Sequence, residues 1–187
     1  MLFFLRKRSL WQEKNKLIGK PKDSSLIART IARNRVLILA APAFIKSYGL
    51  PEKIEYLADL PAATFASTTS RVENIHYLNQ RGESEEQKMK SVFRANGGDA
   101  LLMKTLAGSA YFVGPAFLIG GEIKEGRLVP LLTDLQLKEY HPMYAVYPHR
   151  DLPVRTRLFF DAVCEYLGKD KPLWDQAIPN FEELYQS

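Results

Sequence analysis

The chain has 187 residues, of which 46% are hydrophobic and 25% are charged, and its formal net charge is +5. These values are typical of a globular protein with its own core, and they exclude a collagen-like or wholly disordered chain. The single cysteine, Cys164, excludes an internal disulfide framework and a cysteine-based zinc site.

The positive charge is concentrated at the start of the chain. Residues 1–22 contain seven Lys or Arg and one acidic residue, whereas the remainder carries nineteen basic and twenty acidic residues. Such a segment fits a nucleic-acid or acidic-membrane contact, and it equally fits a solvated terminus. Its apolar residues precede the basic ones, the reverse of a secretory signal. The apolar runs 36–45 and 110–121 are too short to span a membrane, so we expect a cytoplasmic protein without membrane contact.

Short strands and helices are predicted to alternate along the rest of the chain. A buried strand is expected at 36–40, followed by a helix that begins at Pro42 and ends at Gly49. Further strands are expected at 63–66, 75–78 and 89–95, with a polar connection at 80–86.

The segment 96–99 reads as a turn that opens a helix, because Asn96 suits a cap and Asp99 suits the positive end of the helix dipole. A strand at 110–113 and a helix beginning at Pro115 follow, and Gly120-Gly121 and Gly126 bracket a predicted turn.

The most regular helical pattern runs from Val154 to a glycine cap at Gly168, after a strand predicted at 143–147. Apolar residues recur every fourth position, with two more widening the stripe: Val154, Leu158, Phe159, Ala162, Val163 and Tyr166. This stripe is the predicted buried face of the helix. The whole pattern predicts an α/β sheet with helices on both faces.

Catalytic and metal-binding patterns are not recognised. The histidines His76, His141 and His149 have no metal-ligand spacing, and Gly97-Gly98 is not followed by the Gly-Lys-Ser/Thr of a phosphate-binding loop. We therefore expect neither an enzyme nor a cofactor or metal.

Several segments, in order and at matching spacing, resemble the effector-binding domain of LysR-type transcriptional regulators. They are 23–29, 35–44, 93–101, 106–108, 126–132, 144–150 and the helix 154–167. The resemblance implies a type II periplasmic-binding-protein-like fold, with two α/β lobes joined by two crossing strands and a small effector held between them. It covers about Ile18 to Leu167.

The resemblance also implies a division of the chain. Residues 1–17 are an atypical basic tail, 18–35 a remnant of lobe one with the first crossing, 36–147 lobe two, and 148–187 the return to lobe one and the C-terminal tail. The winged helix-turn-helix of the family and the first half of lobe one have no counterpart. The chain is thus expected to be truncated at its N-terminus and to meet DNA only indirectly.

Candidate ligand contacts fall in two turns and one apolar wall. The hydroxyl turn is Ser67, Thr68 and Thr69, the helix-opening turn is Asn96, Gly97 and Gly98, and the wall is Phe112 and Pro115. Backbone N–H groups at a helix start suit a carboxylate, which predicts an anionic effector. Ordinary turn formation and helix capping account for the same residues without a ligand.

Two functions remain open. The first is the effector-binding portion of a LysR-type regulator, which senses a small molecule and acts through homo- or hetero-oligomers with DNA-binding chains. The second is a module that acts without DNA, as a small-molecule binder, a decoy for an intact regulator, or a non-functional fragment.

Overall fold

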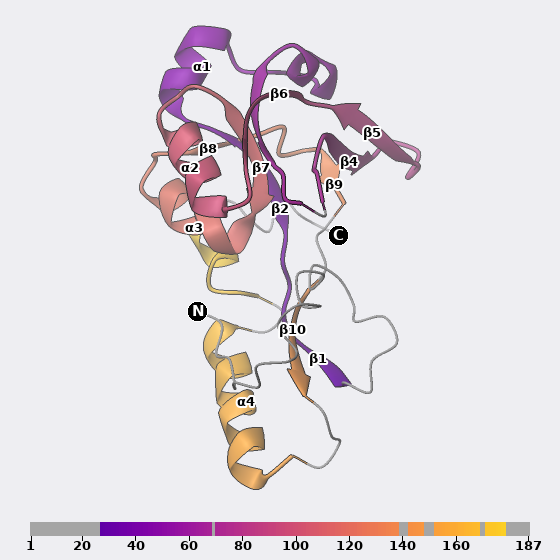
Figure 1. Cartoon of the computed structure of the whole chain (residues 1–187), viewed down its shortest axis with the longest axis vertical. Helices are drawn as coiled ribbons and strands as arrows, with labels where there is room; N and C mark the ends of the chain where they lie inside the picture. The colour runs from indigo at the N-terminus through magenta and orange to yellow at the C-terminus, as the bar shows by residue number, and fades with distance from the viewer. Residues whose placement is uncertain (1–26, 69, 139–141, 148–151, 169–170, 179–187) are drawn as a thin grey trace.

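The computed structural model describes residues 27–68, 70–138, 142–147, 152–168 and 171–178. They form two units that lie end to end (Figure 1). The main body contains β2 through β9 with helices α1 to α3, and the lower module contains β1, β10 and α4. The atypical basic tail predicted at 1–17 lies outside the described residues.

The main body is built on a five-stranded sheet in the order β6-β3-β7-β2-β8. Its strands are β2 (Val36–Ala40), β3 (Pro61–Phe65), β6 (Lys90–Ala95), β7 (Tyr111–Pro115) and β8 (Val129–Leu131). The pairs β3–β6 and β3–β7 are parallel, and β2 is antiparallel to both β7 and β8. The sheet is therefore mixed, and the predicted α/β architecture is confirmed.

Strand β2 occupies an inner position because its side chains are apolar on both faces. All five residues of β2 are buried. Ile38 belongs to a core with Phe44 and Leu57 on one face of the sheet. Leu37 and Leu39 belong to a second core on the opposite face. A continuous apolar run of this kind is what a strand covered on both sides requires.

Helices cover both faces of this sheet. One face carries α1 (Pro42–Tyr48) and the 3-10 helix η2 (Ile54–Ala58), and the other carries α2 (Gly98–Leu106) and α3 (Ala116–Lys124). Helix α1 begins at the predicted proline and ends at Gly49, which has a φ of +83°. Proline suits a first helical turn, and glycine suits a helix end that needs a positive φ, so both signals gave the correct bounds.

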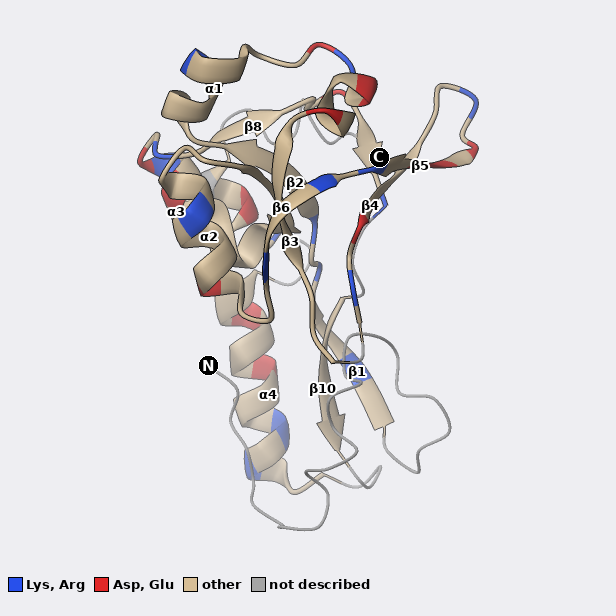
Figure 2. Cartoon of the chain, turned by 45° about the horizontal axis from the view of Figure 1, so that its top comes forward, with Lys and Arg blue, Asp and Glu red and all other residues tan. Residues whose placement is uncertain are grey.

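A second, three-stranded sheet in the order β5-β4-β9 projects from the main body. Its strands are β4 (Asn74–Leu78), β5 (Ser84–Lys88) and β9 (Gln136–Leu137). The prediction of a polar connection at 80–86 is wrong at its C-terminal end, because Ser84 pairs with Leu78 at the start of β5. Figure 2 shows acidic segments along this exposed strand.

The turn predicted between Gly120-Gly121 and Gly126 starts later than expected, because Gly120 and Gly121 lie inside α3 and the chain turns only at 125–126. A Cβ at position 120 would come 2.8 Å from the carbonyl oxygen of Trp174, which packs against this helix. A glycine at 120 thus permits close approach of another segment and does not break the helix.

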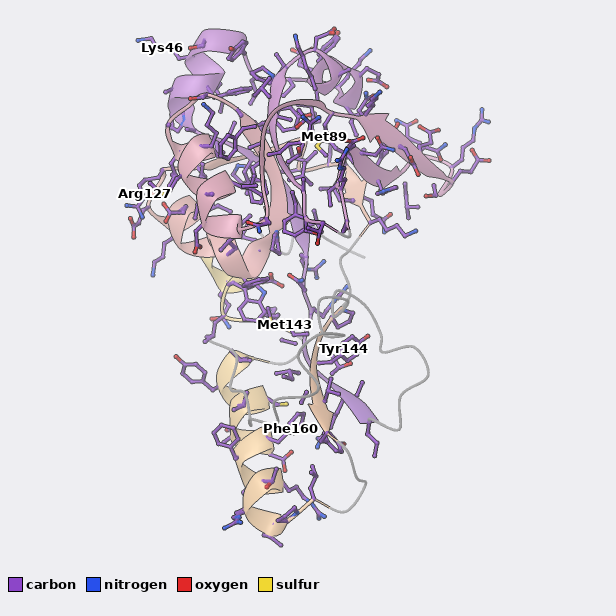
Figure 3. All side chains as sticks on the ribbon, in the orientation of Figure 1. Lys46, Met89, Arg127, Met143, Tyr144 and Phe160 are labelled. Carbon is purple, nitrogen blue, oxygen red and sulfur yellow. The ribbon has the colours of Figure 1, made fainter. Side chains whose placement is uncertain are left out.

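The lower module consists of an antiparallel pair, β1 (Ile27–Ala32) with β10 (Met143–Tyr147), and helix α4 (Val154–Leu167). Strand β10 falls within the second crossing predicted near 140–148, whereas β1 ends at Ala32, where the first crossing was predicted to begin. Phe160, which is 7% exposed, lies under the guanidinium of Arg29 at 4.3 Å from the ring centroid. Arg29 also forms a 3.4 Å ion pair with Asp161, so this side of α4 faces β1 (Figure 3).

The predicted buried face of α4 is wrong. Phe159 is 62% exposed, and four other members of the predicted stripe are exposed as well: Val154, Leu158, Ala162 and Tyr166. The helix buries Phe160 instead, on the opposite side. The stripe defined in the sequence analysis, called the α4 stripe below, is thus an uncovered apolar face among the described residues.

The segment that follows α4 returns to the main body (Figure 1). It contains the short 3-10 helix η3 (Asp175–Ala177), and Ile178 joins the core beneath α2 and α3. Among the described residues, no helix has the length and apolarity needed to cross a membrane.

Candidate functional site

Three parallel strands of the main body end at the same edge of the sheet. Phe65 of β3 lies opposite Ala95 of β6, and β7 runs parallel on the other side of β3. Strand β2 starts at this edge, because Val36 pairs with Pro115. Since β2 follows β1 closely, this carboxyl edge faces the lower module (Figure 1). The ends of adjacent parallel strands are where open α/β sheets bind ligands.

The predicted hydroxyl turn lies directly after β3 on the carboxyl edge. The N–H of Ser67 donates to the carbonyl of Ser70 at 2.7 Å, and the N–H of Ser70 donates to the Ser67 hydroxyl at 3.1 Å. Thr68 is exposed, and Thr69 lies outside the described residues. The Ser67 hydroxyl thus closes the turn itself, and Thr68 is placed at the surface.

The second predicted turn lies directly after β6, beside the first. Asn96 is exposed, and Gly97 is the N-cap of α2, with no side chain capping the helix. A Cβ at Gly98 would come 2.6 Å from Cδ2 of Leu118, whereas a Cβ at Gly97 would meet nothing within 4 Å. The close packing of α2 on α3 therefore explains why a glycine stands at position 98. Gly97 leaves open space at the positive end of α2.

The two members of the predicted apolar wall lie in different environments. Pro115 is half-buried at the end of β7 and is the N-cap of α3. Phe112 is 4% exposed and packs in the core with Leu101 and Ile119. The ring of Phe112 is therefore accounted for by core packing, and Pro115 is the member that lies at the carboxyl edge.

A cation that the sequence analysis did not single out lies at the base of the hydroxyl turn. Arg71 is exposed, and its backbone forms an isolated bridge with Ala66. A basic residue shortly after the run of hydroxyl residues was the available signal. It places a positive charge next to the turn, which suits an anionic ligand.

The titratable groups with perturbed pKa values lie away from this edge. The hydrogen bond from the Tyr77 hydroxyl to Glu85, at 2.6 Å, raises the pKa of Tyr77 to about 12 and lowers that of Glu85. Burial raises the pKa of Tyr111, whose hydroxyl donates to the carbonyl of Leu57. No cluster of three or more potential metal ligands occurs among the described residues.

Comparison with protein families identifies the domain. The family model described as the LysR substrate binding domain matches residues 17–168. The chain belongs to this LysR substrate-binding domain family. The resemblance recognised in the sequence is therefore confirmed.

Curated relatives of this LysR domain are transcriptional regulators. It is 30% identical over 153 residues to the HTH-type transcriptional regulator CrgA of Neisseria meningitidis serogroup B, covering 81% of this chain and 50% of CrgA. It is 30% identical over 164 residues to the HTH-type transcriptional regulator PtxR of Pseudomonas aeruginosa, covering 82% of this chain and 48% of PtxR. The chain spans about half the length of the curated relatives it matches.

Solved structures place the LysR domain among regulatory domains of the same family. The regulatory domain of CrgA from Neisseria meningitidis superposes with a TM-score of 0.66 at 28% identity, over 79% of this chain and 72% of that one. The regulatory domain of AphB from Vibrio vulnificus gives a TM-score of 0.63 at 27% identity, over 78% of this chain and 72% of that one. The expected type II periplasmic-binding-protein-like fold is confirmed.

Proposed function

We propose that this chain is the effector-binding portion of a LysR-type regulator, which binds a small anionic molecule at the carboxyl edge and modulates transcription through association with DNA-binding chains. The observation that carries the proposal is the convergence of two turns and two helix starts on one edge. Parallel pairing of β3 with β6 brings the turn at Ser67 next to the turn at Gly97. Helices α2 and α3 both start there, so their positive ends add to the charge of Arg71.

A carboxylate fits the chemistry of this edge. The open space at Gly97 lies at the N-terminus of a helix of nine residues without a side-chain cap. Backbone N–H groups in the first helical turn have no partner within the helix and can donate to an anion. Thr68 adds an exposed hydroxyl on the neighbouring turn, and Arg71 adds long-range attraction.

Calorimetric titration with small carboxylates, including benzoate and succinate, tests the proposal. The decisive variant is Gly97→Ala, because the added methyl group meets no protein atom within 4 Å and projects into the space proposed for the ligand. We expect it to weaken carboxylate affinity at least about tenfold. The matched control is Gly121→Ala, which adds the same methyl group to open space on α3. Equal affinity in both variants would contradict the site, and absence of carboxylate binding would contradict an anionic effector.

A second candidate function, docking on another LysR-type chain as a decoy, is favoured by the α4 stripe. Phe159 and Tyr166 are exposed on one side of α4 while Phe160 on the other side is buried. Uncovered apolar faces of this kind mark interaction surfaces. Co-purification with a tagged full-length LysR-type regulator, lost in Phe159→Glu and retained in Glu165→Gln, would support this function. Retention of the regulator by Phe159→Glu would contradict it.

A further inference from the structure

The segment after α4 makes a third connection between the lower module and the main body. The other two run through residues 33–35, between β1 and β2, and through the region between β9 and β10. The third, residues 171–178, is called the strap below. Its turns are closed by backbone hydrogen bonds: the N–H of Leu173 donates to the carbonyl of Leu167 at the end of α4, and that of Asp175 to the carbonyl of Pro172.

The strap is anchored on the main body by a buried ion pair. Asp175 is 1% exposed, and its Oδ2 lies 3.3 Å from Nε of Arg35, which is itself buried. Arg35 immediately precedes β2, so this pair joins the strap to the first crossing connection. A charge buried to this degree is retained only with its partner, and removing one partner leaves the other charge uncompensated.

The same anchor reaches the helix that starts at the carboxyl edge. The carbonyl of Arg35 accepts a hydrogen bond from the N–H of Ala116, the first residue of α3, at 2.9 Å. Further along α3, the ring of Phe117 packs edge-on against Trp174 with centroids 6.2 Å apart. At Gly120 the backbone of Trp174 approaches so closely that a Cβ would lie 2.8 Å from its carbonyl oxygen.

We propose that the strap fixes the orientation of α4 relative to α3, with Arg35–Asp175 and the Gly120–Trp174 contact as its two fasteners. The strap thereby links the position of the lower module to the helix that opens at the carboxyl edge. A change at that edge that moved α3 would be passed to α4 through backbone and side-chain contacts that are already in place. The proposal concerns the chain without ligand, so it does not depend on the proposed effector.

Distances between spin labels test this directly. Labels are attached to cysteines introduced as Lys46→Cys on α1 and Glu165→Cys on α4, both exposed positions, in a Cys164→Ala background. Pulsed electron paramagnetic resonance then measures the distribution of distances between the two units. We expect a single narrow distribution in this parent protein, and a broad parent distribution would overturn the proposal.

Adjacent glycines in α3 provide the decisive comparison. Gly120→Ala forces the strap away from α3 without removing a polar group, whereas Gly121→Ala adds its methyl group to open space. Both changes raise helix propensity equally, so that effect cancels. We expect Gly120→Ala to broaden or shift the distribution and Gly121→Ala to leave it unchanged. Identical distributions in the two variants would overturn the proposal.

Asp175→Ala tests the other fastener, the Arg35–Asp175 ion pair. It removes the buried carboxylate from Arg35, and we expect the same broadening as in Gly120→Ala, with the far-UV circular dichroism of the main body retained. An unchanged distribution in Asp175→Ala would exclude the ion pair as a fastener. If Asp175→Ala fails to fold, the comparison of Gly120→Ala with Gly121→Ala decides alone.

Discussion

The guanidinium of Arg29 lies over the ring of Phe160, so one of two adjacent phenylalanines in α4 faces β1 while the other faces away. Phe160→Ala removes a buried ring, and we expect it to lower the free energy of unfolding by about 3 kcal/mol. Phe159→Ala acts on a ring that is 62% exposed and should change that free energy by less than about 0.5 kcal/mol. Urea unfolding followed by circular dichroism compares them, and equal losses would contradict the orientation of α4.

The hydrogen bond between Tyr77 and Glu85 makes stability fall at alkaline pH. The pKa of Tyr77 is raised from 10.0 to about 12, so between these values the unfolded chain releases the phenol proton while the folded chain retains it. The free energy of unfolding therefore decreases as pH rises through this window. Tyr77→Phe should make the decrease in the free energy of unfolding smaller. Part of the decrease should remain, because burial also raises the pKa of Tyr111. Urea midpoints across the window measure it, and an identical decrease in Tyr77→Phe would refute the effect.

Arg71 should affect ligand charge selectivity at the carboxyl edge. We expect Arg71→Gln to weaken the binding of a carboxylate several-fold and to leave the binding of its neutral amide unchanged, because the guanidinium is exposed and acts through charge. Added salt should reduce the difference between wild type and variant, since exposed charges are screened. Calorimetry at low and high salt checks this, and equal weakening for the amide would show a role other than charge.

Substitutions at two glycines with positive φ distinguish the cost of backbone strain from the cost of steric crowding. Gly82 has a φ of +75° and open space around it, so Gly82→Ala should lower the free energy of unfolding by about 1 kcal/mol through strain alone. Gly108 has a φ of +71°, and a Cβ there would lie 2.9 Å from Cβ of Ala43. Gly108→Ala should therefore cost about 1 kcal/mol more than Gly82→Ala. Thermal or urea unfolding measures the loss of stability in both variants. Equal losses would show that the segment at Ala43 moves aside without cost.

Elements that carry their own local signals were predictable. Strand β2 is a continuous apolar run, and helices α1 and α4 are bounded by Pro42, Gly49 and Gly168 at the positions where proline and glycine favour starts and ends. Strand β5 was not predictable from hydrophobicity, because it has no buried face. Its polar side chains pair across to β4: Glu86 accepts a hydrogen bond from the side-chain amide of Asn74 at 2.6 Å.

Features that depend on distant segments could not be read from local pattern. The spacing of apolar residues correctly placed them along one side of α4. It could not show which side of the helix is buried, because that depends on the contact of Phe160 with Arg29 of β1. Gly120 was predicted to mark the start of a turn, because its contact with Trp174, a residue far along the chain, leaves no signal in the local sequence. Residues 111–114 of β7 are all buried, so the sequence shows no alternation of polar and apolar residues there. Nothing local therefore indicated which face of the sheet the ring of Phe112 packs on.

The turns of the candidate site were located correctly at strand ends, because Gly, Asn and hydroxyl residues mark such turns locally. That the two turns lie side by side follows from the parallel pairing of β3 with β6, which no local pattern in the sequence indicates. Their role in ligand binding stays a prediction.

The antiparallel pairing of β2 imposes an order on biosynthesis. Its five buried residues leave the ribosome long before the partners that flank it in the finished sheet, β7 at Tyr111–Pro115 and β8 at Val129–Leu131. Until those strands are translated, an apolar segment with unpaired backbone groups is exposed to other nascent chains. While residues 41–128 are being synthesised, β2 therefore lacks at least one of the two strands that flank it in the finished sheet.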